Sequence, residues 1–411
     1  MNIAAFIARR VAFSGQKSFS RFIVRLSVAA TIISVAVMIV TLAFAGGFQQ
    51  TISNKVFSFF GHVRVINYNS TQQVAIAEEL PVRKSDSVLN LPKMVPGIKK
   101  VQAYATKNAI LKTTETIEGV LFKGVEKNYG FDNLKNFLVE GRWINFDDSS
   151  YNKEINLSAS MAKQLNLKVK DQVMIFFIQP NGAPPRPRKL TVVGIFKTGI
   201  EEYDKLFALG DLRLIQRLND WTPEQIGGYE LILDQPNDMD RVSYDIVPYL
   251  PFDVTSQTIK ESFPSIFDWL QLQDQTIYIV MAIMMVIATL NLITCLLILV
   301  LERTRMIGLL KALGSPNGTV QRIFLYQGSI ISGVGILGGL LLGLLMCWLQ
   351  YQYGFITLSE DTYYISKAAV YLVWWQVALV VLATFVVCFL ILLIPSAIVK
   401  TVQPIRAIQF R

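Results

Sequence analysis

Residues 277–301 read IYIVMAIMMVIATLNLITCLLILVL, an apolar run that carries one amide, Asn291, and no charge. A helix of about 20 residues crosses the hydrocarbon core of a bilayer, so this run is long enough to span a membrane. A helix also satisfies every backbone polar group within the span itself. Three further stretches share this composition. We therefore predict four transmembrane helices, at residues 22–46, 274–301, 323–350 and 369–396.

The composition of the whole chain agrees with an integral membrane protein. Charged residues make up 17% of the 411 positions, whereas soluble globular proteins carry about 25%. The formal net charge of +9 suits either nucleic acid or anionic lipid. Because the positive charges gather beside the apolar runs, we favour membrane lipid and predict no nucleic-acid partner. Cys295, Cys347 and Cys388 all lie in apolar runs, so no disulfide framework is predicted for the polar region.

The orientation in the membrane follows from the short loops, since cytoplasmic loops carry an excess of Lys and Arg. Basic residues dominate the segments 1–21, 302–322 and 397–411, whereas 351–368 has two acidic residues and one lysine. Both termini and the segment 302–322 are therefore predicted to be cytoplasmic. The large region 47–273 and the short loop 351–368 are predicted to lie on the opposite, extracytoplasmic side.

The N-terminal segment allows more than one interpretation. Ala43-Phe44-Ala45 before Gly46 resembles a signal-peptidase site. The basic region ahead of it is about 25 residues long and the apolar run exceeds the usual length of about 7–15, which argues against cleavage. Within residues 1–21, apolar positions at helical spacing alternate with basic ones, as is typical of an amphipathic helix on the inner membrane face. A plain basic anchor that only fixes the topology is an equal alternative.

The region 47–273 has the pattern of an α/β domain. Two strand-like runs occur within 106–124, with turn chemistry at 113–116 between them, and residues 157–165 and 211–218 are predicted to be helical. Other runs of apolar and β-branched residues predict strands at 62–68, 172–178, 189–196 and 229–233.

A proline-rich segment, PNGAPPRP at residues 180–187, separates two of these predicted strands. Proline fixes φ and lacks a backbone N–H, which disfavours both a helix and a central strand here. We therefore predict a stiff projecting loop. Its candidate functional residues are Pro180, Asn181, Gly182, Pro184, Pro185, Arg186 and Pro187.

Motifs for catalysis and cofactor binding are missing from the sequence. His62 is the only histidine, and the sequence has no HExxH, no CxxC and no G-x-x-x-x-G-K-[ST] phosphate-binding loop. A lone histidine is more often structural than catalytic. We interpret Glu201, Glu202 and Asp204 as a solvated acidic loop rather than a general acid–base pair. The sequence thus predicts no catalytic, cofactor or metal site, and no ATPase of its own.

The cytoplasmic segment 302–322, ERTRMIGLLKALGSPNGTVQR, contains a short apolar helix. We predict that it ends at Gly314 and that Ser315 and Pro316 begin the next helix, as N-cap and first residue. An exposed apolar helix is normally covered, either by lipid headgroups or by a groove on a partner protein. The residues of this candidate docking surface are Arg305, Met306, Ile307, Leu309, Leu310, Lys311, Leu313 and Gly314.

The third predicted span carries Gly335, Gly339 and Gly343 at intervals of four residues. Small residues at this spacing let two helices approach closely, so we predict a packing face without choosing its partner. The alternative is the general tolerance of glycine in membrane helices. Asn291, deep in the second span, is predicted either to bond across helices or to face a substrate path.

The segment 302–328, ERTRMIGLLKALGSPNGTVQRIFLYQG, resembles the signature after the second span of FtsX/MacB-type ABC transporter permeases. That signature reads roughly E-R-x-R-E-I-G-x-L-R-A-L-G-A, and here Met306 replaces the second glutamate and Lys311 an arginine. The resemblance implies that this is the coupling helix, which docks into a dimer of a separate, LolD-like ATPase that binds ATP and Mg. The matching residues are Glu302, Arg303, Arg305, Ile307, Gly308, Leu310, Ala312, Leu313 and Gly314.

Three further segments, 27–65, 176–204 and 402–411, resemble lipoprotein-releasing permeases of the LolC/LolE type. The resemblance implies four transmembrane helices, both termini inside, and a MacB-like periplasmic core domain between the first two helices. It also implies a multi-pass protein of the bacterial inner membrane that extracts lipoproteins and hands them to a LolA-like periplasmic carrier. A second permease subunit would complete a homodimer or a LolC/LolE heterodimer. The loop 180–187 lies where LolC-type subunits have their carrier-binding hook.

Related functions on the same architecture stay open. FtsX-like relatives transmit ATP hydrolysis to envelope partners such as cell-wall hydrolases, and MacB-like relatives drive efflux. FtsX usually has a smaller extracytoplasmic domain, and MacB carries its ATPase on the same chain, so both differences argue against these alternatives. A membrane-anchored enzyme is disfavoured by the missing catalytic residues. The sequence is equally compatible with a LolC-like, a LolE-like and a homodimeric role.

Overall fold

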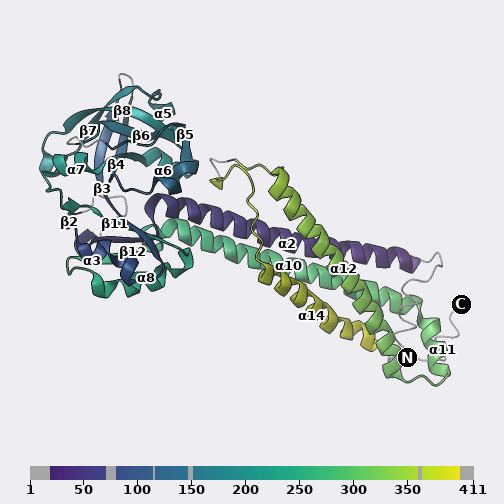
Figure 1. The fold of residues 1–411 in the computed structure, drawn as a ribbon. Coiled ribbons are helices and arrows are strands. Elements are labelled where there is room, and N and C mark those ends of the chain that lie inside the picture. Colours follow the sequence, from purple (N-terminus) through teal and green to yellow (C-terminus); the bar gives the residue numbers. More distant parts are fainter. Residues whose placement is uncertain (1–18, 71–79, 114–115, 147–150, 360–362, 399–411) are drawn as a thin grey trace. The chain divides into compact units, whose positions relative to one another are not determined.

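The computed structural model describes residues 19–70, 80–113, 116–146, 151–359 and 363–398 (Figure 1). Most of the segment 1–21 and of the tail 397–411, for which an amphipathic helix and a cytoplasmic tail are predicted, lies outside these residues. The chain divides into two compact units, each with its own internal contacts. The helical unit comprises Met1–Gln50, Leu270–Thr357 and Lys367–Arg411, and the sheet unit comprises Thr51–Trp269 and Leu358–Ser366.

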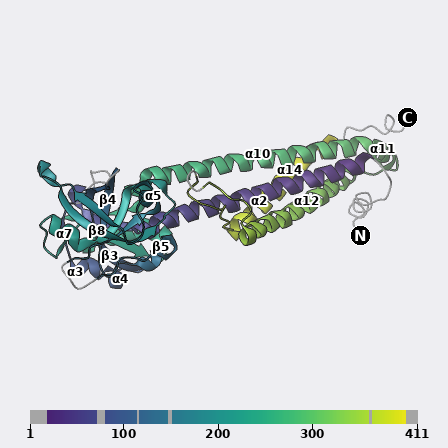
Figure 2. The same cartoon turned by 90° about the horizontal axis from the view of Figure 1, so that it is seen from above.

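Four long helices supply the apolar spans of the helical unit (Figure 2). Each contains an apolar stretch long enough to cross a membrane. Their inward side chains pack together, for example Val35 of the first helix with Ile336 of the third and Val380 of the fourth. The helices are α2 (Phe19–Phe60), α10 (Pro264–Glu302), α12 (Asn317–Tyr353) and α14 (Trp374–Ile398), with the short α11 (Thr304–Ala312) between α10 and α12.

The ends of the helices differ from the ends of the predicted spans. α2 continues past residue 46 to Phe60, since Gly46 and Gly47 stay helical. At Gly47 another chain segment leaves no room for a side chain. A Cβ atom on Gly47 would lie 2.2 Å from the carbonyl oxygen of Ala369. The segment 369–373 is correspondingly not helical, and the N–H of Tyr371 donates to the carbonyl of Ala43 at 3.0 Å. The fourth helix therefore begins at Trp374 rather than at residue 369.

The sheet unit is built on a mixed sheet. In the described residues the sheet has ten strands. Nine follow the order β12-β1-β11-β3-β4-β9-β6-β8-β5, and the tenth, β7, pairs with β3 and β8. The pairs β4–β9 and β6–β8 are parallel. The strands are β1 (Val63–Asn67), β3 (Ile98–Lys112), β4 (Ile117–Val125), β5 (Leu138–Gly141), β6 (Glu154–Ser158), β7 (Gln172–Phe177), β8 (Arg186–Phe196), β9 (Phe207–Asp211), β11 (Gly228–Leu233) and β12 (Val254–Thr258), with β2 (Val82–Arg83) and β10 (Gln225–Ile226) forming a separate pair.

The long strand β3 connects the two halves of this sheet. Its first residues pair with β11, its last residues pair with β7, and β4 lies along it from Tyr104 to Lys112. Short helices cover the strands and the loops between them. They are α3 (Asp86–Leu89), α4 (Leu91–Met94), α5 (Ala159–Gln164), α6 (Glu201–Leu206), α7 (Leu212–Leu218), α8 (Met239–Asp245) and α9 (Ile259–Ser262), with 3-10 turns η1 (Tyr68–Ser70), η2 (Phe131–Phe137), η3 (Pro180–Gly182), η4 (Pro236–Asp238) and η5 (Val247–Tyr249).

The core of the sheet unit includes the last turns of α2. Phe59 and Phe60 contact Phe207 at ring-centroid distances of 5.4 and 5.2 Å, in edge-to-face arrangements that aromatic pairs prefer. Both side chains belong to the same buried cluster as the strands. The end of α2 is therefore part of the core of the sheet unit and not only a connection to it.

Most of the predicted elements of this region are confirmed. The predicted strands at 62–68, 172–178 and 229–233 correspond to β1, β7 and β11, and the turn at 113–116 joins β3 to β4. The helix predicted at 157–165 is wrong at its start. Residues up to Ser158 belong to β6, and Ser158 caps α5 by accepting a hydrogen bond from the N–H of Met161 at 3.1 Å.

Candidate functional site

The short helix α11 presents two different apolar faces. Ile307 is fully buried, and Met306 and Leu310 pack beside it. Their partners come from α10, α12 and α14, among them Val300 and Phe324. Leu309 and Leu313 point the other way, with 59% and 78% of their surface exposed. The candidate docking surface is thus smaller than the sequence predicted, because the bundle itself covers half of it.

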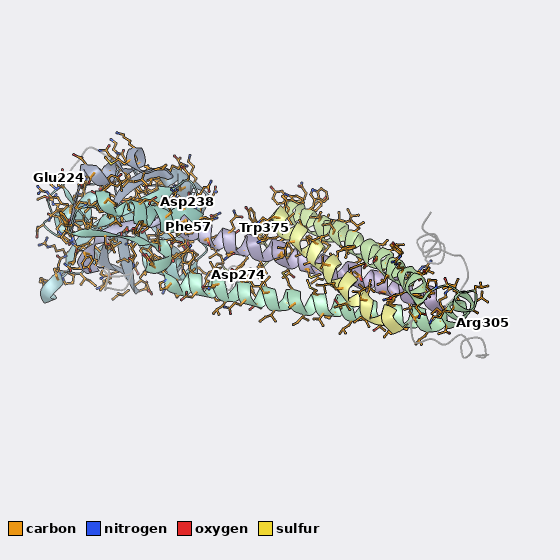
Figure 3. The ribbon with its side chains drawn as sticks, turned by 90° about the horizontal axis from the view of Figure 1, so that it is seen from below. Phe57, Glu224, Asp238, Asp274, Arg305 and Trp375 are labelled. Atoms are coloured by element: carbon orange, nitrogen blue, oxygen red, sulfur yellow. The ribbon has the colours of Figure 1, made fainter. Side chains whose placement is uncertain are left out.

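Arg305 lies four residues before Leu309, and Leu313 four residues after it. Residues at this spacing share one face of a helix, and Arg305 is exposed as well. Figure 3 shows Arg305 at the end of the helical unit where α11 lies. The exposed strip Arg305–Leu309–Leu313 therefore combines a guanidinium with two leucines. We call these three residues the α11 strip.

The end of α11 has a well-defined cap. Gly314 has φ +87, its N–H donates to the carbonyl of Lys311 at 3.0 Å, and the N–H of Ser315 donates to that of Leu310 at 3.0 Å. This is the Schellman arrangement, which requires a left-handed residue and favours glycine. The next helix begins one residue later than predicted, with Pro316 as N-cap and Asn317 as first residue. The cap fixes where the α11 strip ends.

The glycines of α12 contact α2 of the same chain. A Cβ atom on Gly335 would lie 2.7 Å from the Cβ of Thr31, and one on Gly339 would lie 2.6 Å from the Cβ of Val35. Gly343 approaches Ile39 in the same way, at 3.1 Å. The first two distances are too short for a side chain and the third is tighter than an ordinary contact, so the spacing serves close helix contact within the chain.

Asn291 makes a hydrogen bond between helices. Its Nδ2 donates to the backbone carbonyl of Ser27, on α2, at 3.1 Å. The bond joins α10 to α2 and provides the amide with a partner inside an apolar bundle, where an unpaired amide is costly. Of the two predicted roles, this contact corresponds to bonding across helices.

The proline-rich segment is shorter as a loop than predicted. Arg186 and Pro187 belong to β8 and pair with Phe177 and Phe176 of β7, so only residues 178–185 form the turn of this hairpin. The correction has a physical reason. Pro187 lacks an N–H, but Arg186 is held in place by donating to the carbonyl of Leu218 at 2.9 Å and by an ion pair with Asp220 at 3.1 Å.

The turn itself is prominent on the surface. Pro180, Gly182, Pro184 and Pro185 are exposed, and Gly182 has φ +72, a conformation that favours glycine. Residues 180–182 form a single 3-10 turn rather than an irregular loop. Asn181 lies in the same turn.

The side chain of His62 is buried and contacts the backbone and an aromatic ring. Its Nδ1 accepts a hydrogen bond from the N–H of Leu233 at 3.2 Å, and its ring stacks on Phe57 at 4.8 Å. Burial lowers the pKa of His62 to about 4, because a charged imidazole is poorly solvated there. The imidazole is thus held neutral and bound to the backbone, as a structural histidine is.

The acidic cluster does not form a solvated loop, and this prediction is wrong for Asp204. Its carboxylate is buried at α6 and accepts hydrogen bonds from the N–H groups of Thr198 and Gly199 at 2.9 and 3.0 Å, and from the hydroxyl of Thr198 at 2.8 Å. Burial raises the pKa of Asp204, although these hydrogen bonds act in the opposite direction. The carboxylate organises a turn. Over the described part of the chain, no group of three metal-binding side chains comes together.

A contact of Tyr364, in the segment after α12, was not predicted. Lys55 of α2 donates to the carbonyl of Tyr364 at 2.6 Å, and the ring of Tyr364 lies edge-on to Trp269 at 6.0 Å. A small cavity of about 250 Å³ lies beside these residues. No sequence pattern links Lys55 to Tyr364, because the two are separated by most of the chain.

Comparisons with known proteins agree with this architecture. The model of the MacB-like periplasmic core domain matches residues 26–248, and that of the FtsX-like permease C-terminal region matches residues 278–404. The chain belongs to this family of permeases. The fold class predicted from the sequence, four membrane helices with an α/β domain between the first two, is confirmed. The resemblance noted for residues 302–328 falls within the second match.

Among curated proteins, the chain is similar to the lipoprotein-releasing system transmembrane protein LolE of Haemophilus influenzae, with 24% identity over 100% of both chains. It is also similar to the lipoprotein-releasing system transmembrane protein LolC of Neisseria meningitidis serogroup B, with 23% identity over 96% of both chains. Among solved structures, the periplasmic region of MacB from Actinobacillus actinomycetemcomitans covers 50% of this chain and 91% of its own, at 15% identity and a TM-score of 0.34. The chain is thus a multi-pass membrane permease.

Proposed function

We propose that this chain is a permease subunit of an ABC transporter that extracts lipoproteins from the bacterial inner membrane and hands them to a periplasmic carrier. The observation that carries the proposal is the end-to-end match to a lipoprotein-releasing LolE protein. Matches of this kind extend through both the membrane helices and the sheet unit, so they cover all the parts that such a subunit needs.

We propose that the energy for extraction comes from a second protein. The sequence contains no phosphate-binding loop, so ATP and Mg would be bound by a separate, LolD-like ATPase dimer. The α11 strip supports this proposal, because it exposes two leucines and an arginine. An amphipathic helix with such a face fits a groove on a partner. A second permease, identical or of the other Lol type, would complete the transporter.

The exposed turn 178–185 is proposed to bind the carrier. Deleting residues 180–185 leaves Arg186 and Pro187 in the strand, so the hairpin is preserved. We expect the deletion to abolish binding of a purified LolA-like carrier to the full transporter, and a Gly/Ser replacement of equal length to do the same. Carrier binding that is unchanged in both variants contradicts this assignment.

The proposed function is tested by reconstitution. The chain is purified with its co-expressed partner permease and ATPase and placed in liposomes that contain a labelled lipoprotein. We expect ATP and soluble carrier together to move the label from the membrane to the carrier. Cells depleted of the chain should retain outer-membrane lipoproteins in the inner membrane. Normal lipoprotein sorting with chained or drug-sensitive cells would instead point to an FtsX-like or MacB-like role.

A further inference from the structure

Three elements of the sheet unit meet at one buried lysine, Lys123 of β4. Its ammonium nitrogen lies 2.6 Å from Oε1 of Glu230, which belongs to β11. It also lies 2.6 Å from the backbone carbonyl oxygen of Phe59, in the last turn of α2. The side chains of Lys123 and Glu230 are 1% and 0% exposed. An ion pair is thus enclosed where α2 meets the sheet.

All three ammonium protons of Lys123 have an acceptor. The third acceptor is the hydroxyl of Tyr129, at 3.1 Å. This hydroxyl lies 3.3 Å from Oε2 of Glu230, to which it donates. Burial and the nearby carboxylate of Glu230 hold the pKa of Tyr129 well above its usual value, so the phenol keeps the proton that it donates. Gln102 completes the cluster by donating to the same carboxylate oxygen at 3.4 Å.

The surroundings of this junction are aromatic and buried. The ammonium lies 4.9 and 5.3 Å from the ring centroids of Phe59 and Phe60, and 5.5 and 5.4 Å from those of Tyr104 and Tyr129. Cations are attracted to aromatic faces at such distances. A buried ion pair is nevertheless weak evidence for stability, since well-packed apolar residues often stabilise a protein as much. What the pair adds is direction, because charge-assisted hydrogen bonds fix both distance and angle.

The carbonyl that Lys123 binds is one that the helix leaves unpaired. The last four carbonyls of an α-helix have no partner within it. α2 ends at Phe60, and Gly61 turns the chain with φ +75 while its N–H closes on Phe57 at 2.8 Å. Lys123 therefore caps the end of a continuous helix that begins at Phe19 and carries the first apolar span.

We propose that Lys123 is a positioning residue that fastens the last turn of α2 to strands β4 and β11, so that a displacement of α2 moves the sheet as one body. The proposal rests on the proposed function, because the movement of the sheet is the step that would couple ATP hydrolysis to transfer of the lipoprotein to the carrier. Tyr129 and Gln102 hold the Glu230 carboxylate in place. Gln102 belongs to β3 and Tyr129 to the segment that follows β4, so the junction extends to both.

The fastening is tested first on the unaltered transporter by hydrogen exchange and mass spectrometry. If the junction holds, the amides of residues 57–61 open together with those of β4 and β11, at the same rate. Amides of the last turn that exchange more than about tenfold faster than the strand amides, a difference of about 1.4 kcal/mol, overturn the proposal. This measurement needs no variant and no transport activity.

The consequence for transport is tested with the double variant Lys123→Met and Glu230→Gln, which removes both charges and leaves no buried ion unpaired. The matched control is Lys84→Met with Glu126→Gln, an ion pair of the same 2.6 Å length in the same unit that is partly exposed. We expect the double variant to keep its ATPase rate and its strand protection. The last turn of α2 should exchange faster by about tenfold, the effect of losing one charge-assisted bond. Lipoprotein released per ATP should fall by a similar factor.

The possible results of these two experiments test different parts of the proposal. Unchanged release per ATP, with a loosened last turn, overturns the transmitting role of Lys123. If the control loses as much release as the double variant, the effect is not specific to the junction, and the proposal fails. A double variant that does not fold leaves the decision to the exchange rates of the unaltered chain. If the unaltered transporter releases no lipoprotein at all, the proposed function fails while the exchange data still decide the fastening.

Discussion

Truncating the two exposed leucines of the α11 strip gives the sharpest test of the predicted contact with an ATPase. Full burial of a leucine side chain is worth about 1.5–3 kcal/mol. Leu309 and Leu313 are 59% and 78% exposed, so most of this free energy is still available to a partner. Scaling by these fractions gives about 2–4 kcal/mol, and alanine keeps one methyl group at each position, so the variant Leu309→Ala with Leu313→Ala should lose about 1–3 kcal/mol of binding, or roughly 5- to 150-fold in Kd.

The measurement is the affinity of a fluorescently labelled ATPase for the purified permease complex, followed by anisotropy. The matched control is Leu272→Ala on α10, because Leu272 has the same exposed fraction of 59% and lies beyond the other end of the predicted span. A second comparison is Ile307→Ala, which removes a buried side chain of the same helix and should lower stability by about 2–5 kcal/mol. An affinity that changes less than about threefold in the double variant, or as much in Leu272→Ala, refutes the docking assignment.

Two further predictions concern packing and pH. Gly339→Ala should lower the free energy of unfolding of the helical unit by about 1–3 kcal/mol, because the added carbon overpacks against Val35. The control is Gly333→Ala on the same helix, which has nothing within 4 Å of its added carbon and should leave the free energy of unfolding equal or higher. Equal losses at both sites would contradict the close contact. Burial lowers the pKa of His62 from 6.5 to about 4, so between these pH values the unfolded chain binds a proton at His62 that the folded chain does not. The free energy of unfolding is therefore highest above pH 6.5 and falls as the pH drops towards 4. At pH 5 the sheet unit should have lost about 2 kcal/mol relative to pH 7, measured by urea unfolding, and His62→Gln should abolish this difference; a loss that persists in His62→Gln would assign it to other groups.

The membrane helices are predictable from the sequence because the bilayer imposes a simple requirement. Lipid offers no hydrogen bonds, so each span has to be a helix of apolar residues, and composition alone marks it. The ends of the helices follow other rules. α2 continues to Phe60 through residues whose apolar side chains face a protein core instead of lipid. Hydropathy does not distinguish these from any other amphipathic segment, so the predicted span stops too early.

The partition of α11 shows a second limit of periodicity. Its spacing identifies apolar residues on a short helix, but Ile307 and Leu309 are two positions apart and lie on opposite sides. Which side is covered depends on Val320 and Phe324, which belong to the following helix. The docking residues predicted from the sequence therefore include both the residues that hold α11 in place and those that it exposes. Only the packing of neighbouring helices separates the two.

Buried charges are the least predictable feature of this chain. Lys123 and Glu230 lie in strands, where polar residues at alternating positions usually face solvent, and 107 residues separate them in the chain. Asp204 lies in an acidic run that is typical of a surface, and its partners are mainly backbone N–H groups. In each case the charge is tolerated because every hydrogen-bonding group finds a partner, which is a property of the folded arrangement.

Two kinds of contact hold α2, and their physics differs. The contact between Val35 of α2 and Gly339 of α12 is possible because glycine has no side chain. Lipid tails provide no hydrophobic driving force for helix association, so close packing has to hold the two helices together. At Phe59, in the core of the sheet unit, hydrophobic packing is available but does not fix a direction. Three directed hydrogen bonds from Lys123 fix the direction of the contact. α2 is one helix from Phe19 to Phe60, so the same element carries a steric contact in its apolar span and an ionic junction at its end. The proposed role of Lys123 depends on this helix, because α2 contributes residues to both units.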